Sequence, residues 1–111
     1  MYYVEEIQIE KAKELLEACG LSTPVGIDYT AGVYNDNGKL VATGSLKGDM
    51  IQGIAVDPAF QGEDLTAKVF THLIQTTDRE SLYLFTKGLV YKASFVLINS
   101  NFNHKIDSIL S

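Results

Sequence analysis

Apolar residues near the start of the chain recur at the three- and four-residue spacing of one helix face. The residues on that face are Ile9, Ala12, Leu15, Leu16 and Cys19. Gly20 follows as a stop signal, because glycine adopts the left-handed conformation that ends many helices. The pattern predicts an amphipathic helix from about Val4 to Cys19.

The middle of the chain changes to the two-residue period of β-strands. Apolar and polar positions alternate over Ile27–Val33, and Leu40–Leu46 returns after Asn35-Asp36-Asn37-Gly38. Asparagine and glycine tolerate the positive φ of hairpin turns, so the four residues from Asn35 to Gly38 predict a turn. A further turn at Lys47-Gly48-Asp49 leads into Met50–Val56. Three antiparallel strands in sequence order form a meander.

The second half of the chain alternates between helical and extended patterns. Apolar residues share one face over Leu65–Thr77, which predicts a helix. Ser81–Thr86 is apolar on both faces and predicts a strand in the interior of the sheet. Leu89, Val90, Ala93 and Leu97 have helical spacing, and Phe102–Leu110 predicts a last strand. The sequence therefore predicts an α+β protein with a mainly antiparallel sheet and helices on both faces.

Composition narrows the class of protein. A length of 111 residues fits one domain over 1–111, and a 46% hydrophobic share is that of an ordinary globular protein. The net charge of −5, with nine basic residues, disfavours nucleic acid as a partner. No apolar run approaches the ~20 residues of a membrane span, and Met1–Glu6 lacks the basic region of a signal peptide. We therefore expect no membrane partner and a cytoplasmic location.

Reactive and metal-binding side chains are sparse. The single cysteine, Cys19, excludes an internal disulfide and a cysteine-rich zinc site. It stands at the end of a predicted helix, where the negative end of the dipole should raise its pKa, so a structural role is expected. His72 falls beside an apolar helix stripe and is expected to be half-exposed. No histidines and carboxylates have the spacing of metal ligands, and no metal is predicted.

The most informative segment runs from Met50 to Leu65. An apolar strand ends at Asp57-Pro58, passes through Ala-Phe-Gln-Gly and enters a helix. The first amides of a helix have no partner within it, and the macrodipole places about half a positive charge there. A strand, a glycine-bearing turn and a helix N-terminus together form a site for an anion such as a pyrophosphate.

This segment resembles the strand–loop–helix of the GNAT (GCN5-related N-acetyltransferase) superfamily, which carries Gln/Arg-x-x-Gly-x-Gly/Ala and holds the pyrophosphate of acetyl-coenzyme A. Gln61 and Gly62 fit the motif, whereas Asp64 stands at the central glycine and Thr66 at the last small residue. The resemblance implies an acyl-CoA N-acyltransferase fold in which splayed strands open the coenzyme cleft. The predicted elements follow that order without its first strand and with the C-terminal strands truncated.

A closer resemblance covers nearly the whole chain. Leu15-Leu16 to Gly20-Leu21, Asn37–Gly44 and Leu84–Lys87 are similar to the N-terminal acetyltransferase-like domain of citrate lyase ligase, which acetylates the prosthetic-group thiol of citrate lyase. In that family a second, nucleotidyltransferase-like domain carries a His-x-Gly-His motif, which this sequence lacks. The resemblance implies an accessory domain or a fragment of a longer chain. Its implied partners are that C-terminal domain and the acyl-carrier subunit of citrate lyase.

The resemblance also assigns candidate site residues. The residues implied for acetyl-CoA binding are Ala55, Val56, Asp57, Gln61, Gly62, Glu63, Asp64, Leu65 and Thr66. Tyr91 is the candidate catalytic acid because it falls in the helix that supplies that group in the superfamily. A tyrosine packed against the sheet is the structural alternative for this residue. Gln52 can form hydrogen bonds but cannot take a proton at neutral pH.

Asp64 is the residue that distinguishes two hypotheses about function. A glycine at this position lets the backbone approach a pyrophosphate, whereas Asp64 adds a Cβ and a carboxylate. The first hypothesis is an acetyltransferase domain that binds acetyl-CoA, with that binding weakened by Asp64. The alternative is a non-catalytic domain with a degenerate coenzyme site that positions the ligase or its carrier substrate.

Overall fold

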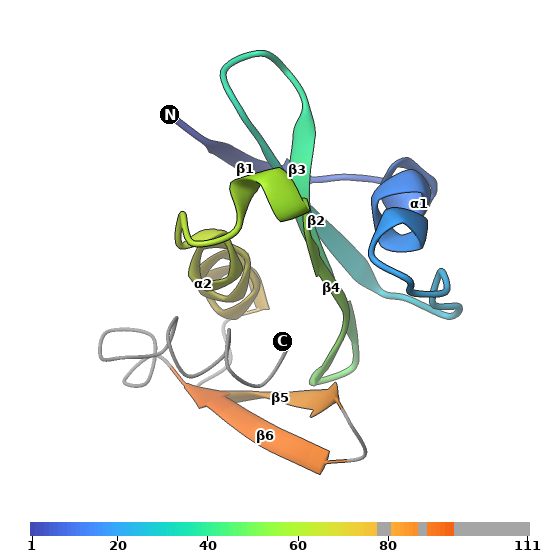
Figure 1. Ribbon diagram of the computed structural model, residues 1–111. Coiled ribbons are helices and arrows are strands. Elements are labelled where there is room, and N and C mark those ends of the chain that lie inside the picture. The colour runs from blue at the N-terminus through green and yellow to red at the C-terminus, as the bar shows by residue number, and fades with distance from the viewer. Residues whose placement is uncertain (78–80, 87–88, 95–111) are drawn as a thin grey trace.

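A computed structural model describes residues 1–77, 81–86 and 89–94 of the chain. In chain order its elements are β1 (Tyr3–Glu6), α1 (Ile9–Ala18), β2 (Tyr29–Tyr34), β3 (Leu40–Lys47), β4 (Met50–Val56), a 3-10 turn η1 (Pro58–Phe60), α2 (Leu65–Thr77), β5 (Ser81–Thr86) and β6 (Leu89–Ser94). The strands form one sheet in sequence order, parallel only between β4 and β5. The two helices lie on opposite faces of the sheet (Figure 1). The predicted α+β architecture is confirmed.

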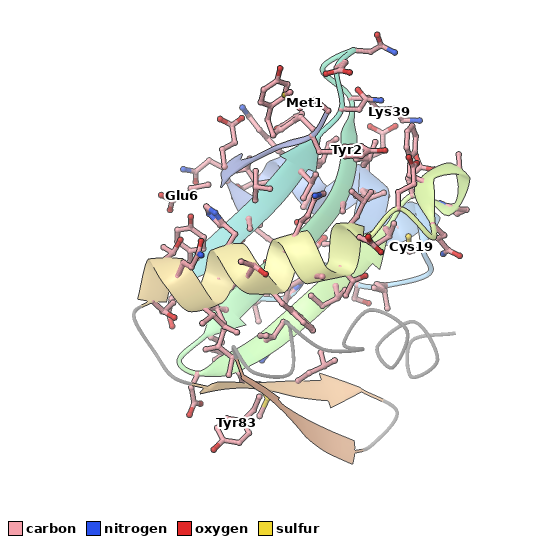
Figure 2. All side chains as sticks on the ribbon, turned by 90° about the vertical axis from the view of Figure 1, so that its left-hand side faces the viewer. Met1, Tyr2, Glu6, Cys19, Lys39 and Tyr83 are labelled. Atoms are coloured by element: carbon pink, nitrogen blue, oxygen red, sulfur yellow. The ribbon has the colours of Figure 1, made fainter. Side chains whose placement is uncertain are left out.

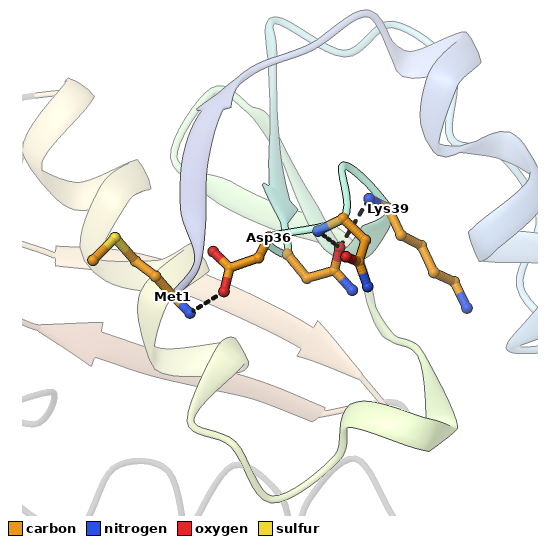
Figure 3. A network of polar contacts seen from close by, with 5 residues as sticks. Met1, Asp36 and Lys39 are labelled. Carbon is orange, nitrogen blue, oxygen red and sulfur yellow. Dashed lines mark hydrogen bonds and ion pairs between the residues drawn. The ribbon is translucent and has the colours of Figure 1, made fainter.

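The predicted meander is also confirmed. β2 pairs antiparallel with β3, and β3 pairs antiparallel with β4. In the first turn, the Asn35 side-chain oxygen accepts hydrogen bonds from the amides of Asn37 and Lys39, each at 3.0 Å. Gly38 supplies the positive φ, +76°, that the turn requires. An ion pair of 2.9 Å between the Met1 ammonium and Asp36 fastens the chain start to this turn (Figure 3).

The first helix begins later than the pattern predicts, and a strand precedes it. Tyr3–Glu6, expected to lack strand structure and in part to be helical, pairs with β2 from Tyr3–Tyr34 to Glu6–Ala31. The Ile7 amide continues this contact by donating to the Thr30 carbonyl at 2.9 Å. Gln8 is extended, at φ −73° and ψ 143°, so the helix cannot begin before Ile9. The prediction was wrong because an edge of β2 satisfies these backbone groups, which no local pattern reveals.

The helix predicted from Leu89 is also wrong over its described part. Leu89–Ser94 is strand β6, paired antiparallel with the whole of β5. Only two residues separate the strands, so the chain can pair directly with β5. The hydrogen bonds of this pairing favour a strand over the helix that the weak spacing of Leu89, Val90 and Ala93 predicts. Leu97 and the strand predicted over Phe102–Leu110 lie outside the described residues. β5 lies between β4 and β6, as predicted.

The core consists of two layers, one on each face of the sheet. Between the sheet and α2 lie Val33, Leu46, Phe70 and Leu73, and between the sheet and α1 lie Leu16 and Ala55. Gly44 in β3 lets α2 approach closely, because an added Cβ would lie 2.6 Å from Val69 Cγ1. No helix within the described part of the chain is long and apolar enough to cross a membrane.

Candidate functional site

A cleft opens where β4 and β5 separate. The two strands pair only at Met50–Tyr83 and Ile51–Leu84, with a further bond from the Tyr83 amide to the Asp49 carbonyl at 2.9 Å. Beyond this point lies a cleft with a volume of about 940 Å³. Its lining comes from β4, from Leu84 of β5, from the chain after α1, and from the turn that leads into α2.

The edge of β4 that faces this cleft presents backbone groups. The Asp57 amide donates to the Val41 carbonyl at 2.8 Å, so the backbone groups of Asp57 face β3. Because these groups alternate in direction along a strand, those of Val56 point away from β3. The Cys19 thiol donates to the Val56 carbonyl, with Sγ 3.5 Å from the oxygen. An extended chain that bears amides can pair along such an edge.

Cys19 lies in the lining of the cleft, at the end of α1 (Figure 2). Burial raises the pKa of its thiol, the hydrogen bond to Val56 opposes this, and the nearby Asp57 carboxylate raises the pKa further. The direction agrees with the sequence-based prediction, although burial rather than the helix dipole is the main cause. A neutral thiol that bonds a main-chain carbonyl fits the expected structural role.

A bulge in β4 shapes the middle of the cleft. The pairing of β3 and β4 shifts register between Thr43 and Ser45, and Gly53 has a φ of +64°. Pro24, from the chain after α1, packs closely here, because a Cβ on Gly53 would lie 3.3 Å from its Cγ. The bulge therefore seats the loop after α1 against β4, and both line the cleft.

The turn after β4 is held by Asp57 and Lys39. One Asp57 oxygen accepts from the Ala59 amide at 2.9 Å and caps η1, and the other forms an ion pair with Lys39 at 3.0 Å. Both contacts, the amide bond first, lower the pKa of Asp57. The Lys39 ammonium also lies 5.7 Å from the centre of the Phe60 ring. The hairpin of β2 and β3 thereby fixes the turn.

Residues 61–64 connect η1 to α2 and are exposed. Gly62 has a φ of +86°, and an added Cβ there would meet no atom within 4 Å. Asp64 is the one non-glycine residue in the described chain with a positive φ, at +62°. Its carbonyl accepts from the Lys68 amide at 3.2 Å, which begins the helical bonding of α2. The backbone therefore keeps a glycine-like conformation although the residue is an aspartate.

Tyr2 lies beside this loop, at the end of the sheet where Lys39 also lies (Figure 2). Burial raises the pKa of its hydroxyl, and a hydrogen bond to the Glu63 carboxylate raises it further. The Glu63 side chain is therefore directed toward Tyr2. Glu63 is also absent from the lining of the cleft. Of the two consecutive acids, Asp64 is the one that belongs to the lining.

The structure brings together most of the residues that the sequence analysis assigned to the acetyl-CoA site. The nominated residues that line the cleft are Ala55, Val56, Gln61, Gly62, Asp64, Leu65 and Thr66. Asp57 and Glu63 lie in the same turn, where they bind Lys39 and Tyr2 instead. Tyr91 lies in β6 and not in a helix, in register with Leu84.

Sequence reasoning missed the other wall of the cleft. That wall comes from the end of α1 and the loop after it, and its residues are Ala18, Cys19, Leu21, Ser22 and Pro24. They carry no motif, and only the packing of the loop on Gly53 places them there. Gln52, considered earlier for hydrogen bonding, also lines the cleft.

A second polar cluster lies away from the cleft. The Tyr29 hydroxyl is 2.6 Å from His72 Nε2, and their ring centres are 5.8 Å apart. Burial lowers the pKa of His72, opposed by the Glu6 carboxylate. The partly buried histidine agrees with its predicted exposure, and its bond to Tyr29 ties α2 to β2.

Comparison with known proteins gives a partial sequence match and a clear structural one. No family model matches the chain. The chain is 28% identical over 86 residues to the citrate (pro-3S)-lyase ligase of Haemophilus influenzae, and the match covers 75% of this chain. It is 40% identical over 52 residues to the Klebsiella pneumoniae ligase, covering 44% of this chain. The matches span only 26% and 15% of these relatives' own lengths.

Solved acetyltransferases share the fold. Glucosamine-6-phosphate N-acetyltransferase from Arabidopsis thaliana aligns with a TM-score of 0.56 at 18% identity, covering 78% of this chain and 83% of that one. A GNAT-family acetyltransferase from Staphylococcus aureus aligns with a TM-score of 0.60 at 14% identity, covering 78% and 74%. The chain therefore has the GNAT acetyltransferase fold. Its sequence is similar to a segment of citrate lyase ligases, as predicted.

Proposed function

We propose that this domain binds the pantetheine arm of an acyl thioester, as in acetyl-CoA, in the cleft between β4 and β5. The observation that carries the proposal is the position of this cleft. It runs from the backbone edge of β4 at Val56 to the turn and helix N-terminus at Gly62–Thr66. The β4 edge offers pairing partners to an amide-bearing arm, and the first turn of α2 offers amides to a phosphate.

The backbone of the site fits this ligand. The space beside Gly62 is open, and Asp64 has a positive φ, a conformation that glycine adopts most readily. Ala55 and Val56 would hold the arm, and the amides of Gly62, Leu65 and Thr66 would hold a phosphate. When bound, the thioester would supply the acyl group.

The side chain of Asp64 opposes a diphosphate. Two unit charges ~5 Å apart repel by ~3 kcal/mol at an effective dielectric of ~20 and by ~1 kcal/mol in water. Asp64 is exposed, so the repulsion lies between these two limits. Both limits are at least as large as the attraction of a helix N-terminus for an anion, which is about 0.3–1 kcal/mol. Coenzyme A binding is therefore weakened by about five- to a hundredfold.

Binding is tested by thermal unfolding in the presence of coenzyme A. A ligand that binds only the folded state stabilises it by ~2.7 kcal/mol at a hundredfold excess over Kd. Ser22→Trp should abolish this shift by filling the cleft mouth, since Ser22 is exposed in the lining. Val25→Trp is the matched control, because Val25 is 81% exposed and outside this lining. No shift at millimolar ligand, or an equal shift in the Ser22 variant, contradicts the proposed site.

The effect of Asp64 is tested by calorimetry on Asp64→Gly. The variant should bind coenzyme A about five- to a hundredfold more tightly, since a repelling charge and a Cβ are removed. Micromolar or tighter binding by the unmodified chain, unchanged in the variant, contradicts this role.

Acyl transfer to an amine also needs a proton acceptor near the reacting thioester. Among the described residues that line the cleft, Gln52 and Ser22 cannot serve at neutral pH, and the Cys19 thiol is neutral.

For a transferase function, Tyr91 is the candidate acid, because its register places it across from Leu84. Tyr91→Phe should then lower acetyl transfer without changing coenzyme affinity. Equal transfer rates for the two proteins would exclude that role.

The second candidate function is a non-catalytic positioning domain of a ligase. Two observations favour it. The relatives that match are ligases several times longer than the match, and the described residues of β4 in the cleft lining include no side chain that can take a proton at neutral pH. Its partners would be a nucleotidyltransferase-like domain and the acyl-carrier subunit of citrate lyase, in the cytoplasm. Calorimetry with the isolated carrier subunit tests this function. Binding of the carrier without measurable acetyl transfer supports it, and transfer to a free amine contradicts it.

A further inference from the structure

The cleft has an uneven distribution of charge. Among the described residues of its lining, Asp64 is the only one with a charged side chain. The wall formed by β4 and the loop after α1 is apolar or neutral, with Gln52 and Ser22 as its polar groups apart from the Cys19 thiol. The two ends of the site therefore favour different chemistry.

Nearby cations do not offset the acidic end. The Lys39 ammonium is 3.0 Å from Asp57 and lies over the Phe60 ring. Its charge is therefore paired with the Asp57 carboxylate. Glu63 adds a second negative charge next to Asp64 and contacts Tyr2. Lys68 is exposed, one helical turn further along α2, and forms no ion pair with Asp64 among the contacts of the described residues. The entrance to the helix N-terminus is thus acidic on its rim.

The conformation of Asp64 places this charge at the turn itself. Its φ of +62° is a conformation that glycine adopts most readily, and its carbonyl accepts the first helical hydrogen bond of α2, from Lys68, so the residue lies directly before the free amides of the first turn. An anion drawn to these amides approaches the carboxylate at the same time. The amides attract one phosphate, and each additional charge on the ligand meets the same repulsion.

These observations concern the ligand class of the proposed site and rest on the proposed function. We propose that Asp64 is a specificity-determining residue that makes the cleft prefer a pantetheine arm with at most one phosphate over free coenzyme A. The neutral β4 wall recognises the amide arm, and the acidic turn discriminates against the nucleotide diphosphate.

The test is a calorimetric series with pantetheine, 4′-phosphopantetheine, dephospho-coenzyme A and coenzyme A. These ligands share the arm and carry zero, one, two and three phosphate groups, each of which adds negative charge. The unmodified chain should bind pantetheine and 4′-phosphopantetheine at least as tightly as coenzyme A. Raising the salt concentration should strengthen coenzyme A binding and leave pantetheine binding unchanged, because salt screens the repulsion.

Three variants separate charge from shape. Asp64→Asn keeps the Cβ and should raise the affinity for coenzyme A at least fivefold relative to pantetheine, and Asp64→Gly should do the same. Glu63→Gln removes the neighbouring charge, which lies outside the lining, and should change the ratio of the two affinities less than either Asp64 variant does. Unfolding temperatures confirm that each variant is folded.

Each result has a distinct meaning. Tighter binding of coenzyme A than of pantetheine by the unmodified chain overturns the charge selectivity and leaves the proposed function standing. An unchanged ratio in both Asp64 variants also overturns it. If none of the four ligands binds, the proposed function itself fails.

Discussion

At the scale of single residues, Asp64 has an unusual backbone conformation and His72 is a partly buried titratable group. Asp64 holds a left-handed backbone conformation that costs most residues about 1 kcal/mol, although aspartate tolerates it better than most. His72 is partly buried, and burial lowers its pKa from 6.5. Asp64 shapes the candidate site, whereas His72 shapes the dependence of stability on pH.

His72 should make the protein less stable in mild acid. Because its folded pKa is lowered, the unfolded chain binds more protons between that pKa and 6.5. The free energy of unfolding therefore falls as pH decreases below 6.5, by at most ~1.4 kcal/mol per pH unit for this group. Urea unfolding of His72→Gln should show a flatter profile between pH 7 and 5. Equal slopes in the two proteins would show that Glu6 offsets the effect of burial.

At the scale of elements, helix α2 depends on one face for its packing. Val69 and Leu73 are fully buried against the sheet, as their spacing from Leu65 predicts. Gly44 makes this contact possible by leaving room for Val69. The same helix presents its first turn to the cleft, so its packing also sets the position of the candidate phosphate site.

Leu73→Ala should lower the free energy of unfolding by about 2–5 kcal/mol, because it leaves a cavity between α2 and the sheet. Thr76→Ala is the control on the exposed side of α2 and should change stability by less than about 0.5 kcal/mol. Chemical denaturation of both variants gives the comparison. A loss below ~1 kcal/mol for Leu73 would mean that this face contributes little.

At the scale of the whole molecule, one feature of the sheet creates the site. β4 and β5 are parallel neighbours that pair only at their first contacts and then separate. The separation leaves the Val56 side of β4 facing the cleft, while Ala55 and Asp57 turn their backbone groups to β3. The cleft is therefore a property of the sheet and not of any single loop.

Hydrogen exchange should report on this arrangement. The Val56 amide points away from β3 and should exchange faster than the Asp57 amide, which bonds Val41 at 2.8 Å. A saturating pantetheine ligand should slow Val56 markedly and leave Asp57 nearly unchanged. Equal protection of the two amides in the free protein, or no slowing at Val56 with ligand bound, would contradict this geometry.

The sequence alone determined the meander, helix α2 and the strand–loop–helix, because their alternation, turn residues and apolar spacing are local signals. Only the tertiary structure decided β1 and β6, since each depends on a partner strand that supplies its hydrogen bonds. The wall at Cys19–Pro24 likewise follows from packing against Gly53 and not from a motif. The sequence placed Asp64 at the motif's glycine. The structure showed that the backbone has a positive φ there, which glycine adopts most readily, and that Asp64 belongs to the lining of the cleft.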